Sequence, residues 1–179
     1  MKSPGGDVNL KIGSLAFIAL GANLGNAKAT ILEAVKRLQK LSDEPLLCSS
    51  IWKTSPVDCP TGSPPFINAV IGLVTRPSET PESLLIKLQE LEKEFGRRPK
   101  RVMNEPRPLD LDLIAFGEEK RATENLALPH PLAHIRRFVL QPLSEIAPDL
   151  ILPGQSLSVA EALRELPPDL DMSRLDVFC

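Results

Sequence analysis

Leucines and aspartates alternate from Leu109 to Leu113, and this alternation constrains the fold more than any other stretch of the chain. Successive side chains of an extended strand point to opposite faces, so we expect the leucines to pack into a core while Asp110 and Asp112 share the other face. Aspartate is depleted in strands, and two on one strand face are unusual. The segment therefore predicts a strand that covers a core on one side and carries two carboxylates on the other.

The pair of carboxylates points to a metal site. Neighbouring like charges make each other costlier to ionise unless a cation lies between them. Arg107 supplies one positive charge, which does not neutralise both aspartates. A hard divalent ion, magnesium above all, held by one or two carboxylates together with substrate phosphates would meet this need. The alternative is an exposed strand face with two hydrated aspartates.

A basic segment comes directly before the acidic strand. Between residues 97 and 107 there are five cationic side chains and a single acidic one. They are Arg97, Arg98, Lys100, Arg101 and Arg107, with Glu105. A negatively charged ligand that carries a metal would satisfy both the basic and the acidic segment, whereas a hydrated basic loop is the alternative.

The order of the predicted elements is β-α-β-β-α-β. Strands are predicted at 15–20, 46–54 and 66–75, with the acidic strand as the fourth; helices are predicted after the caps Asn26 and Thr80. This order is typical of an α+β, ferredoxin-like sandwich, in which two helices pack on one face of an antiparallel sheet. Residues 117–179 are expected to add a C-terminal helical elaboration. We expect a flexible leader at 1–14 and a single domain at 15–179.

Composition narrows the function classes. The chain has 179 residues and a net charge of −2, so nothing global indicates a nucleic-acid or membrane partner. Its longest apolar stretches are far shorter than the roughly 20 residues that span a bilayer. The three cysteines form no disulfide framework or metal knuckle, which suits a reducing cytoplasm. We expect a cytoplasmic monomer that acts on small molecules.

Polar residues in unusual places suggest further parts of a site. Asn68 lies on an otherwise apolar strand, where its amide either bonds to the neighbouring backbone or binds a heterocycle. Phe66 is two residues earlier, on the same strand face, and could stack on such a ring.

His130 and His134 would share one face of a helix that begins at Pro131. A zinc site would need a third ligand, so His130 is interpreted as a hydrogen-bond donor to phosphate.

From about Ala16 to Pro148 the chain resembles the 6-hydroxymethyl-7,8-dihydropterin pyrophosphokinases of folate biosynthesis. The most specific block is Pro-Arg-Pro-Leu-Asp-Leu-Asp-Leu at 106–113. The other blocks, in order, are Ala-Leu-Gly-Ala-Asn-Leu-Gly-Asn at 19–26, Ser-Ser-Ile-Trp-Lys-Thr-Ser-Pro at 49–56, Phe-Ile-Asn-Ala-Val at 66–70, Phe-Gly-Arg at 95–97, Pro-His-Pro at 129–131 and Arg-Phe-Val-Leu-Gln-Pro-Leu-Ser-Glu-Ile-Ala-Pro-Asp at 137–149.

The resemblance implies transfer of the β,γ-pyrophosphate of ATP to the 6-hydroxymethyl oxygen of the reduced pterin, with release of AMP. It implies that Asp110 and Asp112 hold two Mg²⁺ ions on the triphosphate, with Arg97 and Arg107 as further catalytic residues. The implied pterin-binding residues are Thr54, Val57, Phe66, Asn68 and Phe138, of which the two phenylalanines would stack on the ring. The implied ATP-binding residues are Gln89, Glu92, Leu113, His130 and Arg136.

Two departures from the family pattern fall in the basic loop. The family commonly has Trp-Gly before Pro-Arg, where this chain has Asn104-Glu105, and Pro99 replaces an arginine two residues after Arg97. Long loops carry mobility and function, so these changes are expected to slow the chemistry or alter closure of the loop over the substrates. The Asn104→Trp variant is expected to speed pyrophosphoryl transfer in single-turnover measurements; an unchanged rate would contradict this interpretation.

Three other functions fit parts of the pattern. A different magnesium-dependent nucleotidyl or phosphoryl transferase would release ADP or free pyrophosphate instead of AMP. A nucleic-acid-binding module of the same topology would stack bases on sheet aromatics, but the chain has no tyrosine and one tryptophan, and its sheet face is acidic. A catalytically weakened pterin binder would bind the pterin without ATP-dependent turnover.

Overall fold

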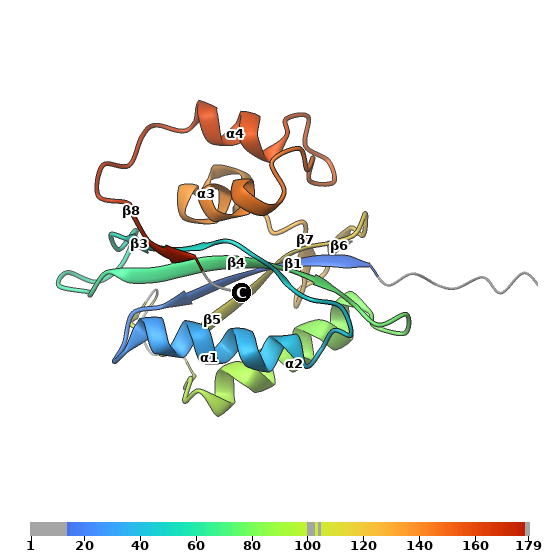
Figure 1. The fold of residues 1–179 in the computed structure, drawn as a ribbon, viewed down its shortest axis with the longest axis horizontal. Coiled ribbons are helices and arrows are strands. Elements are labelled where there is room, and N and C mark those ends of the chain that lie inside the picture. The colour runs from blue at the N-terminus through green and yellow to red at the C-terminus, as the bar shows by residue number, and fades with distance from the viewer. Residues whose placement is uncertain (1–13, 100–102, 104, 178–179) are drawn as a thin grey trace, which may run out of the picture.

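A computed structural model describes residues 14–99, 103 and 105–177 (Figure 1). The strands are β1 (Leu15–Ala22), β2 (Leu47–Cys48), β3 (Ser50–Thr54), β4 (Phe66–Val74), β5 (Asp110–Phe116), β6 (Arg121–Ala122), β7 (Ala127–Leu128) and β8 (Ser173–Val177). The helices are α1 (Ala27–Gln39), α2 (Pro81–Glu94), α3 (Arg137–Ile146) and α4 (Val159–Glu165), with a 3₁₀ turn η1 (Ala133–Ile135).

The main sheet is antiparallel, with the strand order β5-β1-β4-β3-β8, and β2 also pairs with β4. The predicted second strand is divided at Ser49, whose hydroxyl accepts a hydrogen bond from the Val70 N–H at 2.9 Å. The register places Gly21 of β1 between Asn68 of β4 and Asp110 of β5. Residues from three separate parts of the chain therefore meet at one end of the sheet.

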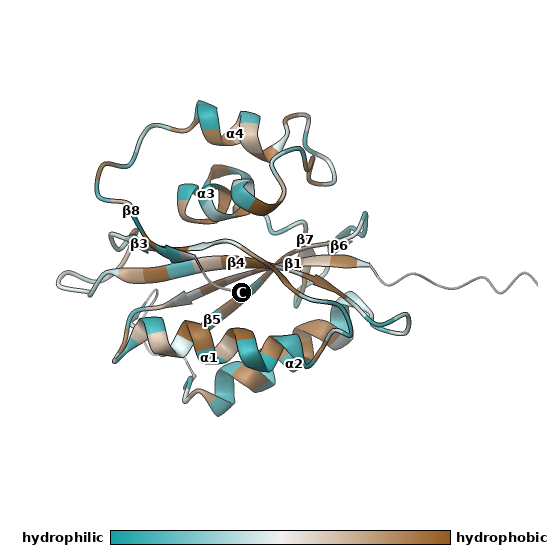
Figure 2. Cartoon of the chain, in the orientation of Figure 1, coloured by the Kyte–Doolittle hydropathy of each residue, from teal (hydrophilic) through white to brown (hydrophobic). Residues whose placement is uncertain are grey.

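Helices cover both faces of the sheet (Figure 1). The leucines of β5 and the apolar sides of α1 and α2 form one core, which confirms the inward direction of Leu111 and Leu113. Phe17, Val70 and Ile114 pack against α3 and α4 in a second core. In Figure 2, hydrophobic and hydrophilic bands alternate along α1 and α2, as expected of helices with one buried side.

The C-terminal part of the chain adds two helices and one strand. The expected helical elaboration corresponds to α3 and α4, which cover the second face of the sheet, where Phe17, Val70 and Ile114 present an apolar surface. No strand was expected in this part of the chain, but it contains β8, which pairs with β3 at the edge of the sheet. Pairing between segments so far apart in sequence leaves no local pattern.

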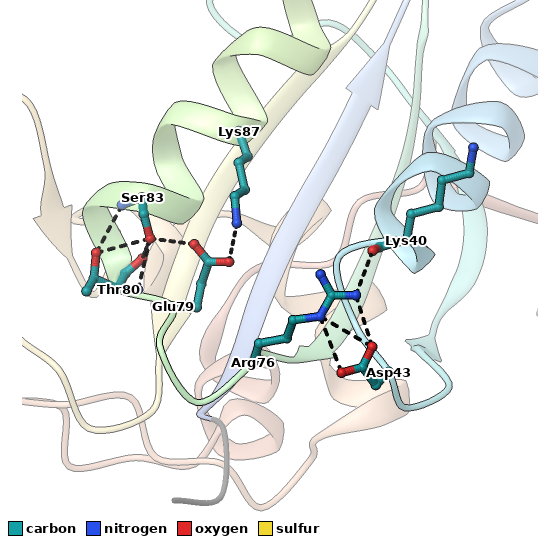
Figure 3. A network of polar contacts seen from close by, with 7 residues as sticks. All are labelled: Lys40, Asp43, Arg76, Glu79, Thr80, Ser83 and Lys87. Atoms are coloured by element: carbon teal, nitrogen blue, oxygen red, sulfur yellow. Dashed lines mark hydrogen bonds and ion pairs between the residues drawn. The ribbon is translucent and has the colours of Figure 1, made fainter.

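Both main helices begin at the predicted caps. The Asn26 side chain accepts a hydrogen bond from the Ala29 N–H at 3.1 Å. At α2, Thr80 and Ser83 form a reciprocal capping box, and Figure 3 shows the surrounding polar network. In that network, Arg76 Nη2 donates a hydrogen bond to Asp43 Oδ1 at 2.9 Å, which connects the loop after β4 to the loop after α1. These contacts lie at the end of β4 opposite Phe66.

The Thr80→Ala variant is expected to lower the free energy of unfolding by about 1 kcal/mol, because the Ser83 N–H loses its acceptor at 3.1 Å. Urea denaturation monitored by circular dichroism measures the change. Ser78→Ala, an exposed serine of the same loop, is the matched control and should leave stability unchanged. Equal stability of the two variants would contradict the capping role.

Two details differ from what the sequence suggested. Cys48 is disulfide-bonded, a bond that the sequence did not predict, whereas Cys59 is a free thiol. His130 precedes the short turn η1, so it does not share a helical face with His134. The expected helix that begins at Pro131 is absent, because η1 comprises only Ala133–Ile135. Within the described residues, no group of three or more His, Cys, Asp or Glu side chains is placed to hold a metal, and no helix is long and apolar enough to cross a membrane.

Candidate functional site

A cavity of about 410 Å³ opens where β1, β4 and β5 meet, on the sheet face that α3 and α4 cover farther along. Its walls come from the sheet, from the loop after β3, and from the segment between η1 and α3. Its lining residues include Gly21, Thr54, Val57, Cys59, Phe66, Asn68, Arg107, Asp110, Asp112, Leu132, Ile135, Arg136 and Phe138. The structure therefore brings together all five residues predicted for the pterin and both predicted metal ligands.

Asp110 and Asp112 both line the cavity, since the leucines between and beside them fill the opposite core. Asp110 is held by two arginines: its carboxylate lies 2.7 Å from Arg97 and 2.9 Å from Arg107. Burial, and then repulsion from Asp110, raise the pKa of the Asp112 carboxyl to about 6. The two arginines therefore neutralise the charge of Asp110 much better than that of Asp112.

The two carboxylates suit a hard divalent cation. Their oxygens are the ligand type that magnesium prefers, and two side chains leave the other positions of an octahedral ion to water or substrate oxygens. A cation there would also relieve the repulsion that raises the pKa of Asp112. The donor set therefore fits magnesium better than a softer metal.

The aromatic part of the cavity combines Phe66 from β4 with Phe138 from α3. Asn68 is 6% exposed, and its Nδ2 donates a hydrogen bond to Thr54 Oγ1 at 2.6 Å. A Cβ at Gly21 would lie 3.2 Å from Asn68 Oδ1, so glycine keeps this part of the floor open. The Arg136 guanidinium lies 5.5 Å from the centre of the Phe138 ring. The pocket thus offers ring faces beside amide and hydroxyl groups.

Glu92 connects the helix layer to the acidic strand. It is buried, accepts a hydrogen bond from the Leu111 N–H at 2.7 Å and pairs with Arg97, which also holds Asp110. Burial is the main cause that raises the pKa of the Glu92 carboxyl to about 7. A proton on Glu92 would leave Arg97 more available to an anionic ligand.

The Glu92→Gln variant is expected to flatten the pH dependence of stability. Because burial raises the pKa of Glu92 from 4.5 to about 7, the folded protein keeps a proton that the unfolded chain releases. The free energy of unfolding should therefore fall as pH rises through this range, by about 3 kcal/mol at most. Urea unfolding of ligand-free protein at about pH 5 and about pH 7.5 measures the fall. It should be smaller in the variant; the same fall in both proteins would contradict the assignment.

Several predicted nucleotide-side residues lie outside the cavity lining. Gln89 is exposed on α2, and the Leu113 side chain is buried in the core beneath the sheet. The backbone N–H of His130 donates to the Ile114 carbonyl at 2.8 Å, and burial lowers the pKa of its imidazole. Of the basic loop, Lys100, Arg101 and Asn104 lie outside the described residues.

Sequence reasoning missed Asn23, which links both loops that border the cavity. This residue is 4% exposed; its Oδ1 accepts from the Arg107 N–H at 2.8 Å, and its Nδ2 donates to the Pro64 carbonyl at 3.3 Å. The Gly-Ala-Asn-Leu-Gly stretch at 21–25 is typical of a turn, and a turn accounts for its asparagine without distant partners. The apolar rim residues Leu132 and Ile135 were missed as well.

Comparisons with known proteins agree on one family. Residues 17–148 match the family model for 7,8-dihydro-6-hydroxymethylpterin-pyrophosphokinase. The chain is 41% identical over 143 residues to the 2-amino-4-hydroxy-6-hydroxymethyldihydropteridine pyrophosphokinase of Haemophilus influenzae, which covers 79% of this chain and 87% of that protein. It is 35% identical over 153 residues to the enzyme of the same name from Methylorubrum extorquens, covering 86% and 94% respectively.

Longer proteins match as well. The chain is 37% identical over 150 residues to the folic acid synthesis protein fol1 of Pneumocystis carinii; the match covers 84% of this chain but only 20% of that protein. A crystal structure of HPPK-DHPS in complex with substrates has the same fold, with a TM-score of 0.70 at 12% identity, over 93% of this chain and 48% of that one. The chain thus spans only part of these longer relatives.

Proposed function

The chain belongs to the 7,8-dihydro-6-hydroxymethylpterin-pyrophosphokinase family, and we propose that it transfers the pyrophosphate of ATP to the 6-hydroxymethyl group of 6-hydroxymethyl-7,8-dihydropterin. The products are AMP and the pterin diphosphate, a step of folate biosynthesis. One observation carries the proposal: a single cavity joins two phenylalanines and a buried amide to a pair of carboxylates. The first group suits a flat heterocycle, and the second suits a metal-bound triphosphate.

The pterin occupies the aromatic part of the cavity in this proposal. Phe66 and Phe138 stack on its two faces, because aromatic rings attract one another when they are stacked at short separation. Asn68 binds the edge of the ring, because its amide offers both a donor and an acceptor; Thr54 and Val57 complete the pocket. The 6-hydroxymethyl group then points toward Asp110 and Asp112.

ATP occupies the charged part. Arg97, Arg107, Arg136 and His130 bind the phosphates, and Gln89, Glu92 and Leu113 border the nucleotide. Asp110 and Asp112 would hold two magnesium ions, which would neutralise phosphate charge and polarise the transferred group. Arg97 and Arg107, which hold Asp110, would be free to bind phosphate oxygens if metal ions neutralised that carboxylate.

Alignment and charge neutralisation supply the catalysis in this account. The attacking group is a primary alcohol, and no strong base was found for it in the sequence. Holding the alcohol in line with the β-phosphorus, and stabilising the charge on the oxygens that leave with AMP, lower the barrier instead. The loop at 54–65, which lines the cavity with Val57 and Cys59, would act as a lid that excludes water. The second expected lid, 97–107, lies partly outside the described residues.

Other parts of the interpretation are proposals of the same kind. The order β5-β1-β4-β3, with α1 and α2 on one face, supports a ferredoxin-like description of the core. Packing of α3 against β4 in the second core supports a single domain over 15–179. A monomer in the cytoplasm, with small molecules as its partners, remains our expectation.

Product analysis tests the function. Purified protein is incubated with magnesium, ATP labelled in the adenine ring, and 6-hydroxymethyl-7,8-dihydropterin, and the products are separated by chromatography. The proposal predicts AMP and a diphosphorylated pterin in equal amounts. Release of ADP or of free pyrophosphate would indicate another transferase, and tight pterin binding without turnover would indicate a binding protein.

A further inference from the structure

We propose that Glu145 is a positioning residue for the pterin pocket, an inference that rests on the proposed function. Glu145 lies in the last turn of α3, away from the cavity lining. Its Oε2 accepts a hydrogen bond from the backbone N–H of Ser50 at 2.5 Å, and its Oε1 accepts one from the indole N–H of Trp52 at 2.9 Å. One carboxylate therefore fastens α3 to β3.

Both elements that Glu145 joins also build the pocket. Phe138 lies seven residues earlier on α3, about two helical turns along the same side of the helix. On β3, Thr54 lies two residues after Trp52 and so on the same strand face. Glu145 thus connects the helix that supplies one ring of the sandwich to the strand that supplies the hydroxyl.

The register of β3 extends this connection to β4. Trp52 lies opposite Asn68, and Thr54 lies opposite Phe66. A shift of β3 relative to α3 would therefore change the spacing between Phe138 and the group formed by Phe66, Asn68 and Thr54. Stacking and edge recognition both depend on that spacing, because ring pairs attract one another over a narrow range of separations.

Apolar packing alone would fix the position of α3 less well. Burial of apolar surface is not directional, so it holds the helix against the sheet without setting its position along the strands. Hydrogen bonds from two donors to one carboxylate are directional and stronger than neutral ones. Ser50 is 1% exposed although Glu145 is exposed, so loss of the carboxylate would leave the Ser50 N–H with poor access to another acceptor.

The Glu145→Ala variant tests the proposal. Trp52 is the only tryptophan of the chain, so its fluorescence reports directly on the loss of the Glu145 contact. Isothermal titration calorimetry is done with 6-hydroxymethyl-7,8-dihydropterin in the presence of magnesium and a non-hydrolysable ATP analogue. We expect a shifted Trp52 emission and a pterin Kd raised about tenfold. The Kd of the ATP analogue itself should stay within about twofold.

Two further variants separate positioning from stability. Trp52→Phe keeps an aromatic ring but removes one donor, so pterin affinity should fall in the same direction by a smaller factor. Asp149→Ala removes an exposed carboxylate just beyond α3 and should change neither the pterin affinity nor the affinity for the ATP analogue.

Wild-type pterin affinity in Glu145→Ala, or equal losses of affinity for pterin and nucleotide, would overturn the proposal. If Glu145→Ala does not fold, the pterin Kd of Trp52→Phe is the deciding measurement. An unchanged pterin Kd in that variant would reject the proposal. Failure of the wild-type protein to bind pterin would instead reject the proposed function.

Discussion

The Asp112→Ala variant is expected to lose magnesium-dependent ATP binding and nearly all turnover while the protein still folds, and Asp110→Ala is expected to do the same. Each substitution removes one of the two carboxylates that face the cavity. Folding should survive in Asp112→Ala because burial and repulsion from Asp110 raise the pKa of Asp112, so its ionised form does not stabilise the apoprotein. Calorimetry with a non-hydrolysable ATP analogue, with and without magnesium, and steady-state AMP release measure the two losses.

A matched control removes the same charge elsewhere. Asp43 is a surface carboxylate held by Arg76 near the opposite end of β4 (Figure 3). Asp43→Ala should keep wild-type ATP affinity and turnover, since exposed ion pairs contribute little even to stability. Near-native rates in either cavity variant would show that the metal assignment is wrong.

The second large effect is expected at the aromatic pair. Phe66→Ala and Phe138→Ala should each raise the pterin Kd about 10- to 100-fold, because stacking of a flat heterocycle on an aromatic side chain contributes roughly 1–3 kcal/mol per ring. ATP affinity should change little in Phe66→Ala, whereas Phe138→Ala also removes the ring beside Arg136 and should weaken ATP binding modestly. Calorimetric titration of dihydropterin into the protein with bound ATP analogue gives the comparison.

Leucine replacements serve as controls for these two positions. Phe66→Leu and Phe138→Leu keep much of the apolar volume but lose the ring face, so their affinities should fall between those of wild type and the alanine variants. Pterin affinity that is unchanged in both alanine variants would contradict the sandwich. Loss of ATP binding in the same variants would mean that the cavity had collapsed.

Local patterns predicted most of the central fold. The caps at Asn26 and Thr80 and the apolar run of β1 all depend on neighbours within a few residues. The strand β8 could not be predicted in this way: it is largely exposed and polar, and its pairing with β3 is a contact between distant parts of the chain. The division of β2 from β3 depends likewise on the bond between Ser49 and Val70.

The candidate site was predicted where its residues carried an unusual local pattern. Two aspartates on one strand face and an asparagine among apolar residues are conspicuous in the sequence, and both line the cavity. Asn23 and Glu145 were not predicted, because an asparagine is ordinary in a turn and a glutamate is ordinary in an amphipathic helix. Asn23 matters through its hydrogen bonds with Arg107 and Pro64. Glu145 matters through its hydrogen bonds with Ser50 and Trp52, and all of these contacts form only in the folded chain.

A crystal structure of the protein with magnesium, a non-hydrolysable ATP analogue and 6-hydroxymethyl-7,8-dihydropterin tests the central claim most directly. We expect electron density for divalent ions between the triphosphate and the carboxylates of Asp110 and Asp112, with the pterin ring between Phe66 and Phe138. A triphosphate bound elsewhere, with both aspartates turned away from its oxygens, would contradict the account.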